Sequence, residues 1–173
     1  MTVPEYRAVH GMWFRQYHRP MGGGATLVCL PHAGGSATAY FGLSAALSAT
    51  AEVLVVQYPG RQDRITEPPV DDIRKLASRI ADALDPWLDR ETVLFGHSMG
   101  AVVAYEVALK LQARTETGAA GLIASGKAAP SIRQDRGMHR RDDAGLTAGL
   151  AELSGTDSAV LASRFHGVGL SEA

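Results

Sequence analysis

The chain has 173 residues, of which 46% are hydrophobic and 20% charged, and its formal net charge is −1 at pH 7. This composition fits one soluble domain with a sizeable hydrophobic core. The balanced charge provides no broad basic surface for nucleic acid and no acidic tail of the disordered kind, which excludes those classes.

Predicted strands and helices alternate along the chain from residue 13 onward. The segment WFRQYH (13–18) can form an edge strand, and PMGGG (20–24) is typical of a turn. Short apolar runs indicate buried strands of a parallel sheet. In chain order these runs are ATLVCL (25–30), EVLVVQY (52–58), TVLF (92–95) and GLIAS (121–125).

The segments between these strands predict helices. Ser36 can cap a helix that extends to about Ser48. Its expected buried stripe consists of Tyr40, Phe41, Leu43 and Leu47. Residues 71–88 have apolar side chains at helical spacing after an acidic start, and residues 101–113 predict a further helix. The alternation predicts an α/β fold, a mostly parallel sheet with helices on both faces.

The alternation of strands and helices ends after Ser125. We divide the chain shortly after this point, into residues 1–129 and residues 130–173. The first part carries the α/β pattern. In the second part, residues 142–153 and 156–165 predict two short helices with acidic starts, and no further buried strand is predicted.

The single cysteine and the apolar segments bear on location. Cys29 lies in the run ATLVCL, as expected for a small buried hydrophobe in a reducing compartment. Residues 1–14 are polar and lack the apolar stretch of a secretory signal. The run AVVAYEVAL is too short for a membrane span and contains Glu106. We therefore expect a cytoplasmic protein that binds neither membranes nor nucleic acid.

The pentapeptide GHSMG (96–100) has the G-x-S-x-G pattern of a nucleophilic serine. This pattern is informative where a strand enters it and a helix leaves it, as TVLF and AVVAYEVALKL predict here. Such a turn strains the backbone of Ser98 and leaves little room for side chains at Gly96 and Gly100. The hydroxyl then lies beside a helix N-terminus that favours negative charge. Ser98 is the predicted nucleophile; the alternative is a serine that only caps the helix.

Acyl transfer also requires an oxyanion hole for the tetrahedral intermediate. The amide of Met99 is one predicted donor, because it follows the serine. The loop PHAGG (31–35) follows the first buried strand, and the amide of Ala33 is the predicted second donor. The neighbours His32, Gly34 and Gly35 are expected to support this loop. His97 is expected to pack against the turn or orient it rather than act as the base, because neighbouring side chains at a sharp bend point apart.

The chain resembles the type II thioesterases of polyketide and nonribosomal peptide synthesis. The resemblance extends from about residue 12 to residue 162 and rests on several motifs in the expected order. They are WFRQYHRP, LVCLPHAGGSATAYF, VQYPGRQDRI, VLFGHSMGAVVAYEVA and LIASGKAAP.

This resemblance implies an α/β-hydrolase fold without a metal or cofactor, and hydrolysis of acyl thioesters on the phosphopantetheine arm of acyl or peptidyl carrier proteins. Such enzymes act as editors that free blocked carriers. The family's nucleophile corresponds to Ser98, and residues from about 130 resemble the start of a lid over the acyl pocket, here a partial lid with an aberrant tail. Arg61 and Arg64 are expected to be solvated charges, or alternatively to organise the pocket mouth or the carrier's phosphate.

The triad acid and base have no clear counterparts in this chain. The order expected for the fold is serine, acid, histidine. His139 and His166 follow Ser98, with Asp142, Asp143 and Asp157 nearby, but nothing in the pattern holds either histidine near the serine. An acid directly after the fourth parallel strand would fall near Ser125 or Gly126, and neither is acidic.

We therefore expect a fold that is incomplete after its fourth parallel strand and an enzyme that is impaired. The uncovered edge of that strand predicts self-association. The alternatives are a non-catalytic module that binds carrier proteins, and another α/β-hydrolase such as an esterase or acyltransferase.

Overall fold

The structure, a computed structural model, describes residues 7–9, 12–22, 24–115, 118–132, 142 and 145. The chain divides into two compact units, Met1–Ala129 and Pro130–Ala173, and most described residues belong to the first. Apart from residues 142 and 145, the helices predicted over 142–153 and 156–165 lie outside the described residues, as do His139 and His166.

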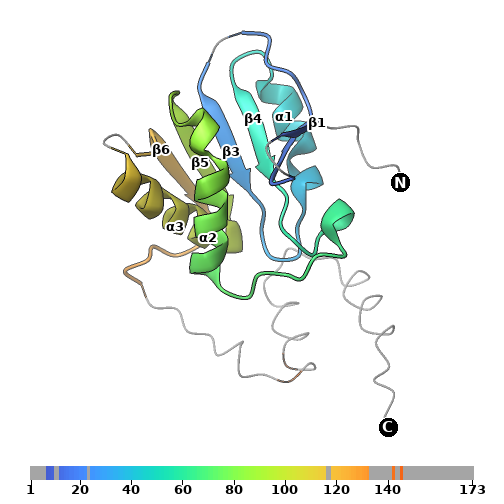
Figure 1. The fold of residues 1–173 in the computed structure, drawn as a ribbon, viewed down its shortest axis with the longest axis vertical. Coiled ribbons are helices and arrows are strands. Elements are labelled where there is room, and N and C mark those ends of the chain that lie inside the picture. The colour runs from blue at the N-terminus through green and yellow to red at the C-terminus, as the bar shows by residue number, and fades with distance from the viewer. Residues whose placement is uncertain are drawn as a thin grey trace. The chain divides into compact units, whose positions relative to one another are not determined.

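A six-stranded sheet forms the centre of the first unit, with strand order β1-β2-β4-β3-β5-β6 (Figure 1). The strands are β1 (Arg7–Val9), β2 (Phe14–Gln16), β3 (Thr26–Leu30), β4 (Glu52–Val56), β5 (Thr92–His97) and β6 (Gly121–Ser125). The last four strands pair in parallel, whereas β1 and β2 are antiparallel to their neighbours. The four apolar runs therefore form the parallel part of the sheet, as predicted.

The strand predicted within residues 13–18 is confirmed as β2, but its predicted position at the edge of the sheet is wrong. Strand β2 pairs with β4 on one side and with β1 on the other, so β1 is the outermost of the described strands. Because β1 has only three residues, RAV, it lacks the length and the alternation that make a strand recognisable in a sequence.

Helices cover both faces of the sheet (Figure 1). They are α1 (Phe41–Leu47), α2 (Ile73–Ala83) and α3 (Met99–Arg114), with short 3-10 segments η1 (Ala37–Tyr40), η2 (Gln62–Arg64) and η3 (Asp85–Trp87). Because successive strand residues point to opposite faces, β3 contributes Val28 and Leu30 to the core with α2 and α3, and Cys29 to the core with α1. The connection from β3 leads to β4 on one side of the sheet order, and the connection from β4 leads back past β3 to β5. Because parallel strands are joined by right-handed crossovers, two connections in opposite directions place their helices on opposite faces.

The first helix differs from its prediction at its start. Ser36 makes no capping hydrogen bond, and its hydroxyl lies 2.9 Å from the hydroxyl of Thr38. The amide of Ala37 instead donates to the Gln57 side chain from the end of β4, at 2.8 Å. A 3-10 turn therefore precedes α1, and Phe41, predicted to be buried, is 37% exposed.

Helix α2 confirms the predicted amphipathic helix but is shorter than the predicted residues 71–88, because it ends at Ala83 and the 3-10 segment η3 follows. Asp72 accepts a hydrogen bond from the Lys75 amide at 2.9 Å and so caps the helix. Its buried face consists of Leu76, Ala77, Ile80 and Ala81. Among the described residues, no helix is both long and apolar enough to cross a membrane.

Candidate active site

Ser98 occupies a sharp turn between β5 and α3. Its backbone has φ 54° and ψ −114°, in the strained conformation expected at such a turn. The Ser98 amide donates to the carbonyl of Ser125 at 2.8 Å, which ties the turn to the end of the neighbouring strand β6. Strain of this kind costs about 1–3 kcal/mol and persists only where surrounding contacts hold it.

The two glycines of the pentapeptide permit close backbone contacts. A Cβ atom on Gly96 would overlap the backbone of Gly100 and Ala101. A Cβ atom on Gly100 would overlap the carbonyl of Leu30, the last residue of β3. The turn therefore packs directly against the end of the adjacent parallel strand, and a side chain at either position would push the two apart.

The loop that follows β3 lies beside this turn. Leu30 of β3 pairs in register with Gly96 of β5, so the chain leaves both strands at the same level. The chain passes from β3 to β4 on one side and then returns to β5 on the other, so the strand order reverses here. In open α/β sheets such a switch point, at the carboxyl ends of the strands, is where ligands bind.

The amides predicted to form the oxyanion hole belong to residues that face one cavity. Ala33 and Met99 both line a cavity of about 220 Å³. In the described part of the chain, neither amide donates to another residue. The other lining residues are Gly34, Tyr58, Pro59, Arg61, Pro69, Val70, Asp71, Ile73 and Leu76. This geometry is compatible with two donors on one oxygen atom, and the assignment of Ala33 and Met99 stays a prediction.

Two buried tyrosines anchor the start of the loop over residues 31–35, and the sequence analysis did not identify them. The Tyr58 hydroxyl donates to the Pro31 carbonyl at 3.1 Å, and the Tyr40 hydroxyl donates to the Leu30 carbonyl at 3.3 Å. Burial raises the pKa of Tyr40 to about 12 and also raises the pKa of Tyr58, so both phenols remain neutral donors. The motif YPGR places Tyr58 at a strand end, but nothing local indicates its acceptor.

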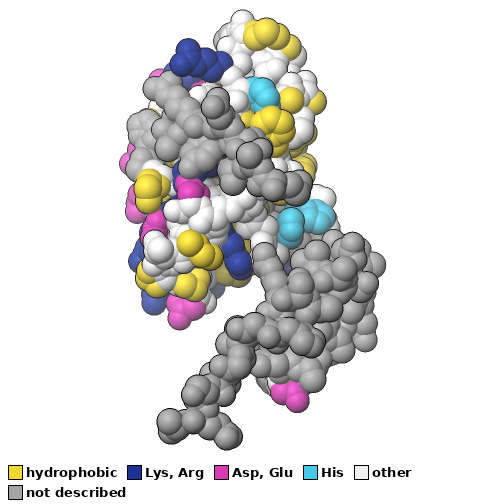
Figure 2. Space-filling model, turned by 90° about the vertical axis from the view of Figure 1, so that its right-hand side faces the viewer, with side chains coloured by type: hydrophobic (Ala, Val, Ile, Leu, Met, Phe, Trp, Pro, Cys, Tyr) yellow, Lys and Arg dark blue, Asp and Glu magenta, His cyan; other side chains and the backbone are white. Residues whose placement is uncertain are grey.

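His32 and His97 approach one another at the rim of the site. Their ring centroids are 6.2 Å apart in an edge-to-face arrangement, and both side chains are exposed. Histidine side chains are visible at the surface in Figure 2. The Nδ1 atom of His97 lies 3.0 Å from the hydroxyl of Ser125. Its side chain thus contacts β6 rather than the Ser98 hydroxyl, and its supporting role stays a prediction.

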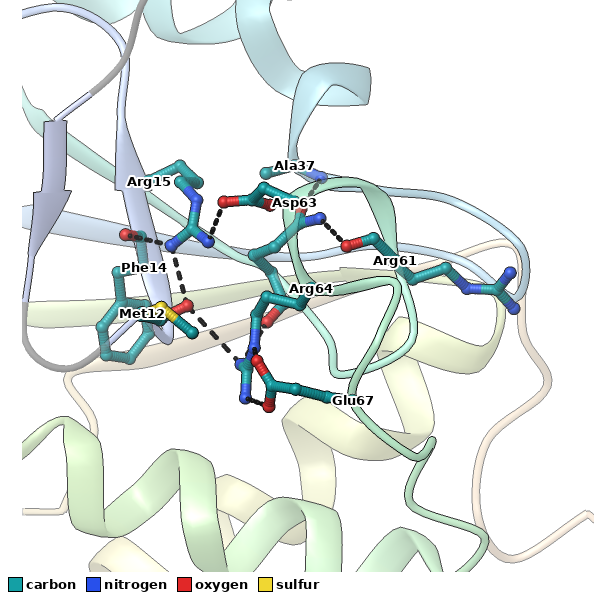
Figure 3. A network of polar contacts seen from close by, with 9 residues as sticks. Met12, Phe14, Arg15, Ala37, Arg61, Asp63, Arg64 and Glu67 are labelled. Carbon is teal, nitrogen blue, oxygen red and sulfur yellow. Dashed lines mark hydrogen bonds and ion pairs between the residues drawn. The ribbon is translucent and has the colours of Figure 1, made fainter.

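A polar network holds the loop that follows β4 (Figure 3). Gln57 is fully buried and bridges two loops, because its Oε1 accepts from the Ala37 amide and its Nε2 donates to the Arg61 carbonyl, each at 2.8 Å. Arg15 forms an ion pair with Asp63 at 2.6 Å. These contacts fix the backbone that carries one wall of the cavity.

The expectation that Arg64 is a solvated charge is wrong. Its side chain is 5% exposed and forms two hydrogen bonds with the Glu67 carboxylate, at 2.7 and 2.6 Å. The guanidinium also donates to the Gln57 carbonyl and lies 4.5 Å from the centroid of the Trp13 ring. The hydrogen bonds from Arg64 hold the pKa of Glu67 below its usual range. The buried Arg64 side chain therefore stabilises the loop from inside rather than lying on its surface.

No histidine in the described part of the chain forms a hydrogen bond with the Ser98 hydroxyl. His18 lies beside Ser44, and the contacts of His32 and His97 are those given above. Of the other candidates, Asp142 accepts a hydrogen bond from the Gly145 amide, and Asp143 and Asp157 lie outside the described residues. Over the same described ranges, no cluster of acidic, histidine or cysteine side chains could hold a metal ion.

Comparisons with known proteins agree on one family. The family model "Thioesterase domain" matches residues 25–167. Thioesterase PikA5 of Streptomyces venezuelae is 44% identical over 162 residues, which cover 93% of this chain and 58% of the relative. The probable cadicidin biosynthesis thioesterase of Streptomyces griseus is 46% identical over 149 residues, covering 86% of this chain and 41% of the relative.

A solved structure gives the same result. The type II thioesterase BorB from the borrelidin biosynthetic cluster is 42% identical and superposes with a TM-score of 0.75. The match covers 86% of this chain and 61% of that one. The chain therefore spans roughly half the length of the curated relatives it matches.

Proposed function

Because the chain belongs to the thioesterase domain family, we propose that it hydrolyses acyl thioesters with Ser98 as the nucleophile. Its α/β-hydrolase fold, a mostly parallel sheet with helices on both faces, matches that of the type II thioesterases. The observation that carries the proposal is the placement of Ser98 in a strained turn between β5 and α3, directly before Met99, which lines the cavity together with Ala33.

In the proposed reaction, the Ser98 oxygen attacks the carbonyl carbon of the thioester. The carbonyl oxygen becomes an oxyanion and accepts hydrogen bonds from the amides of Met99 and Ala33, each of which is worth about 3 kcal/mol of barrier. The carbon–sulfur bond then breaks, and the thiol leaves with a proton. Water attacks the acyl–serine ester, which releases the carboxylic acid and restores the Ser98 hydroxyl.

A general base must accept the Ser98 proton within hydrogen-bond reach. We assign this role to none of the described histidines, because the His97 ring contacts Ser125 and the His32 ring lies beside His97. His139 and His166 remain candidates. The N-terminus of α3 supports the serine independently of the base, because its positive end stabilises developing negative charge.

We further propose that the substrate is an acyl or peptidyl carrier protein with the acyl group on its phosphopantetheine arm, and that the role is editing. The solved type II thioesterase YbtT from the yersiniabactin NRPS/PKS biosynthetic pathway, which is 33% identical to this chain, supports this assignment.

The test combines active-site labelling with turnover. A fluorophosphonate probe should label the full chain at Ser98, and Ser98→Ala should abolish both labelling and hydrolysis of an acetyl-carrier thioester. Ser48→Ala is the matched control, because among the described residues the Ser48 hydroxyl forms a hydrogen bond only with the Ala45 carbonyl, and this variant should behave as the wild type does.

Equal hydrolysis by wild type and Ser98→Ala would remove Ser98 from the mechanism. Carrier binding without labelling or turnover would favour the non-catalytic alternative. Hydrolysis of simple oxygen esters with no activity on carrier thioesters would favour a different esterase or acyltransferase of the same fold.

A further inference from the structure

The side chain of Arg61 lies in a different environment from those of the nearby Arg15 and Arg64. Arg15 and Arg64 are buried and engaged by Asp63 and Glu67. Arg61 is partly exposed and lines the cavity together with Ala33 and Met99. Figure 3 shows its guanidinium directed away from the polar network that holds its neighbours.

The backbone of Arg61 is fixed, whereas its guanidinium is available. The Arg61 carbonyl accepts from Gln57 Nε2 and from the Arg64 amide, both at 2.8 Å. Within the described ranges, no carboxylate or carbonyl pairs with its guanidinium. An arginine anchored at its main chain and unpaired at its head is suited to receive an anion, because its fork of donors matches carboxylate and phosphate oxygens.

The other charged residue of the cavity wall is Asp71, at the start of the segment that leads into α2. Its carboxylate is exposed and forms no ion pair with Arg61. Asp71 lowers the positive potential of the cavity without neutralising the arginine through contact. The remaining lining residues are uncharged, so Arg61 is the cationic side chain among those that line this cavity.

We propose that Arg61 forms an anion-binding subsite of this cavity and holds a phosphate or carboxylate group of the thioester substrate. The inference rests on the proposed function and narrows its substrate class to thioesters that carry an anionic group, either on the acyl part or on the arm. Two groups of the substrate could supply the anion that Arg61 binds: the phosphate of the pantetheine arm, or a carboxylate on the acyl group. Arg61 is a binding and specificity residue here and takes no part in bond cleavage.

The experiment measures binding to the full chain by calorimetry, with amide analogues in which NH replaces the thioester sulfur. N-acetyl analogues of pantetheine and of phosphopantetheine differ only in the phosphate. The N-succinyl analogue of pantetheine carries a terminal carboxylate and no phosphate. Arg61→Gln should weaken binding of an anionic analogue about tenfold and leave the neutral analogue unchanged.

Further variants sharpen this comparison. Arg61→Lys should restore part of the lost affinity, because it keeps the charge without the planar fork. Asp71→Asn should strengthen anion binding, because it removes a like charge from the cavity wall. Arg79→Gln is the matched control, since Arg79 is an exposed arginine of α2 that does not line the cavity, and it should have no effect.

The pattern of loss identifies the source of the anion. A loss confined to the phosphopantetheine analogue assigns the arm phosphate, and a loss confined to the succinyl analogue assigns the acyl carboxylate. The proposal is overturned if neither anionic analogue binds more tightly than the neutral one, or if Arg61→Gln weakens all three equally. Fluorophosphonate labelling of Ser98 separates the two proposals: normal labelling without an anion preference rejects the subsite alone, whereas loss of labelling and turnover rejects the thioesterase mechanism.

Discussion

At the residue scale, a few backbone contacts hold the candidate nucleophile in place. Ser98 has a positive φ, and only contacts elsewhere can maintain that conformation in a residue with a Cβ atom. These contacts are the Ser98 amide with Ser125 and the close approach of Gly100 to Leu30. The buried Tyr40 hydroxyl fixes the same Leu30 carbonyl from the other side of the loop. The position of one hydroxyl thus depends on residues of four different elements.

The first prediction at this scale concerns Gly100. Gly100→Ala should lower the free energy of unfolding by about 3 kcal/mol or more, because its Cβ atom would overlap backbone that cannot move aside. Denaturant unfolding measures the change, and labelling of Ser98 should fall in any protein that still folds.

Gly42→Ala is the matched control, because a Cβ atom at Gly42 on α1 meets nothing within 4 Å. It should leave stability unchanged or raise it by about 0.5 kcal/mol. Equal effects of the two substitutions would contradict the close packing of the turn.

At the element scale, α2 connects the stability of the fold to one wall of the cavity. Asp72 caps the helix, while Asp71, Ile73 and Leu76 line the cavity. The hydrogen bond from the Lys75 amide is the main cause that holds the pKa of Asp72 below its usual range. We therefore expect acid to weaken the cap at the start of this helix, because protonation of Asp72 removes its charge.

A carboxyl whose pKa is lower in the folded state binds its proton more readily in the unfolded state. Its stabilising contribution is therefore present above the unfolded pKa, about 4, and is lost as the pH falls through the lower folded pKa. Asp72→Asn keeps a capping side chain but removes this titration. Urea unfolding measures the free energy of unfolding at each pH. Between about pH 6 and about pH 3, this free energy should fall less for Asp72→Asn than for the wild type.

Asp71→Asn is the control, because Asp71 caps no helix, and it should lose as much stability as the wild type over the same pH range. The prediction fails if Asp72→Asn shows the same acid sensitivity as the wild type.

At the scale of the whole molecule, β1 and β6 form the two edges of the described sheet, and these two strands differ in length. Strand β6 pairs with β5 alone among the described strands, and its Leu122 and Ile123 are 38% and 49% exposed. An apolar strand with an unpaired edge is a template for pairing with a second chain. On the face that Figure 2 shows, hydrophobic side chains occur in several small, separate groups.

We accordingly predict that the 173-residue chain self-associates through β6 as its concentration rises. Sedimentation velocity over a range of concentrations should show dimers or larger species, and Ile123→Lys should shift them toward the monomer. Ile65→Lys is the control, because Ile65 is 67% exposed but lies in the loop after η2. A monomer at every concentration, or equal effects of both lysines, would contradict association through this edge.

The sequence alone determined those features that consecutive residues encode. The four parallel strands are continuous apolar runs, α2 has helical spacing after an aspartate cap, and Gly96 of GHSMG is needed within its own turn. Each of these signals is local, because propensity, periodicity and turn sterics act over a few residues.

Only the tertiary structure decided which distant groups meet. The Gln57 side chain, twenty positions away along the chain, accepts the hydrogen bond of the Ala37 amide, whereas Ser36 makes no capping hydrogen bond. Arg64 is buried against Glu67 and Trp13, and Arg61 is left facing the cavity, although both arginines belong to the same short motif. Such outcomes depend on packing between segments that no local pattern connects, because a side chain's partner is set by the three-dimensional arrangement of the whole sheet and its loops.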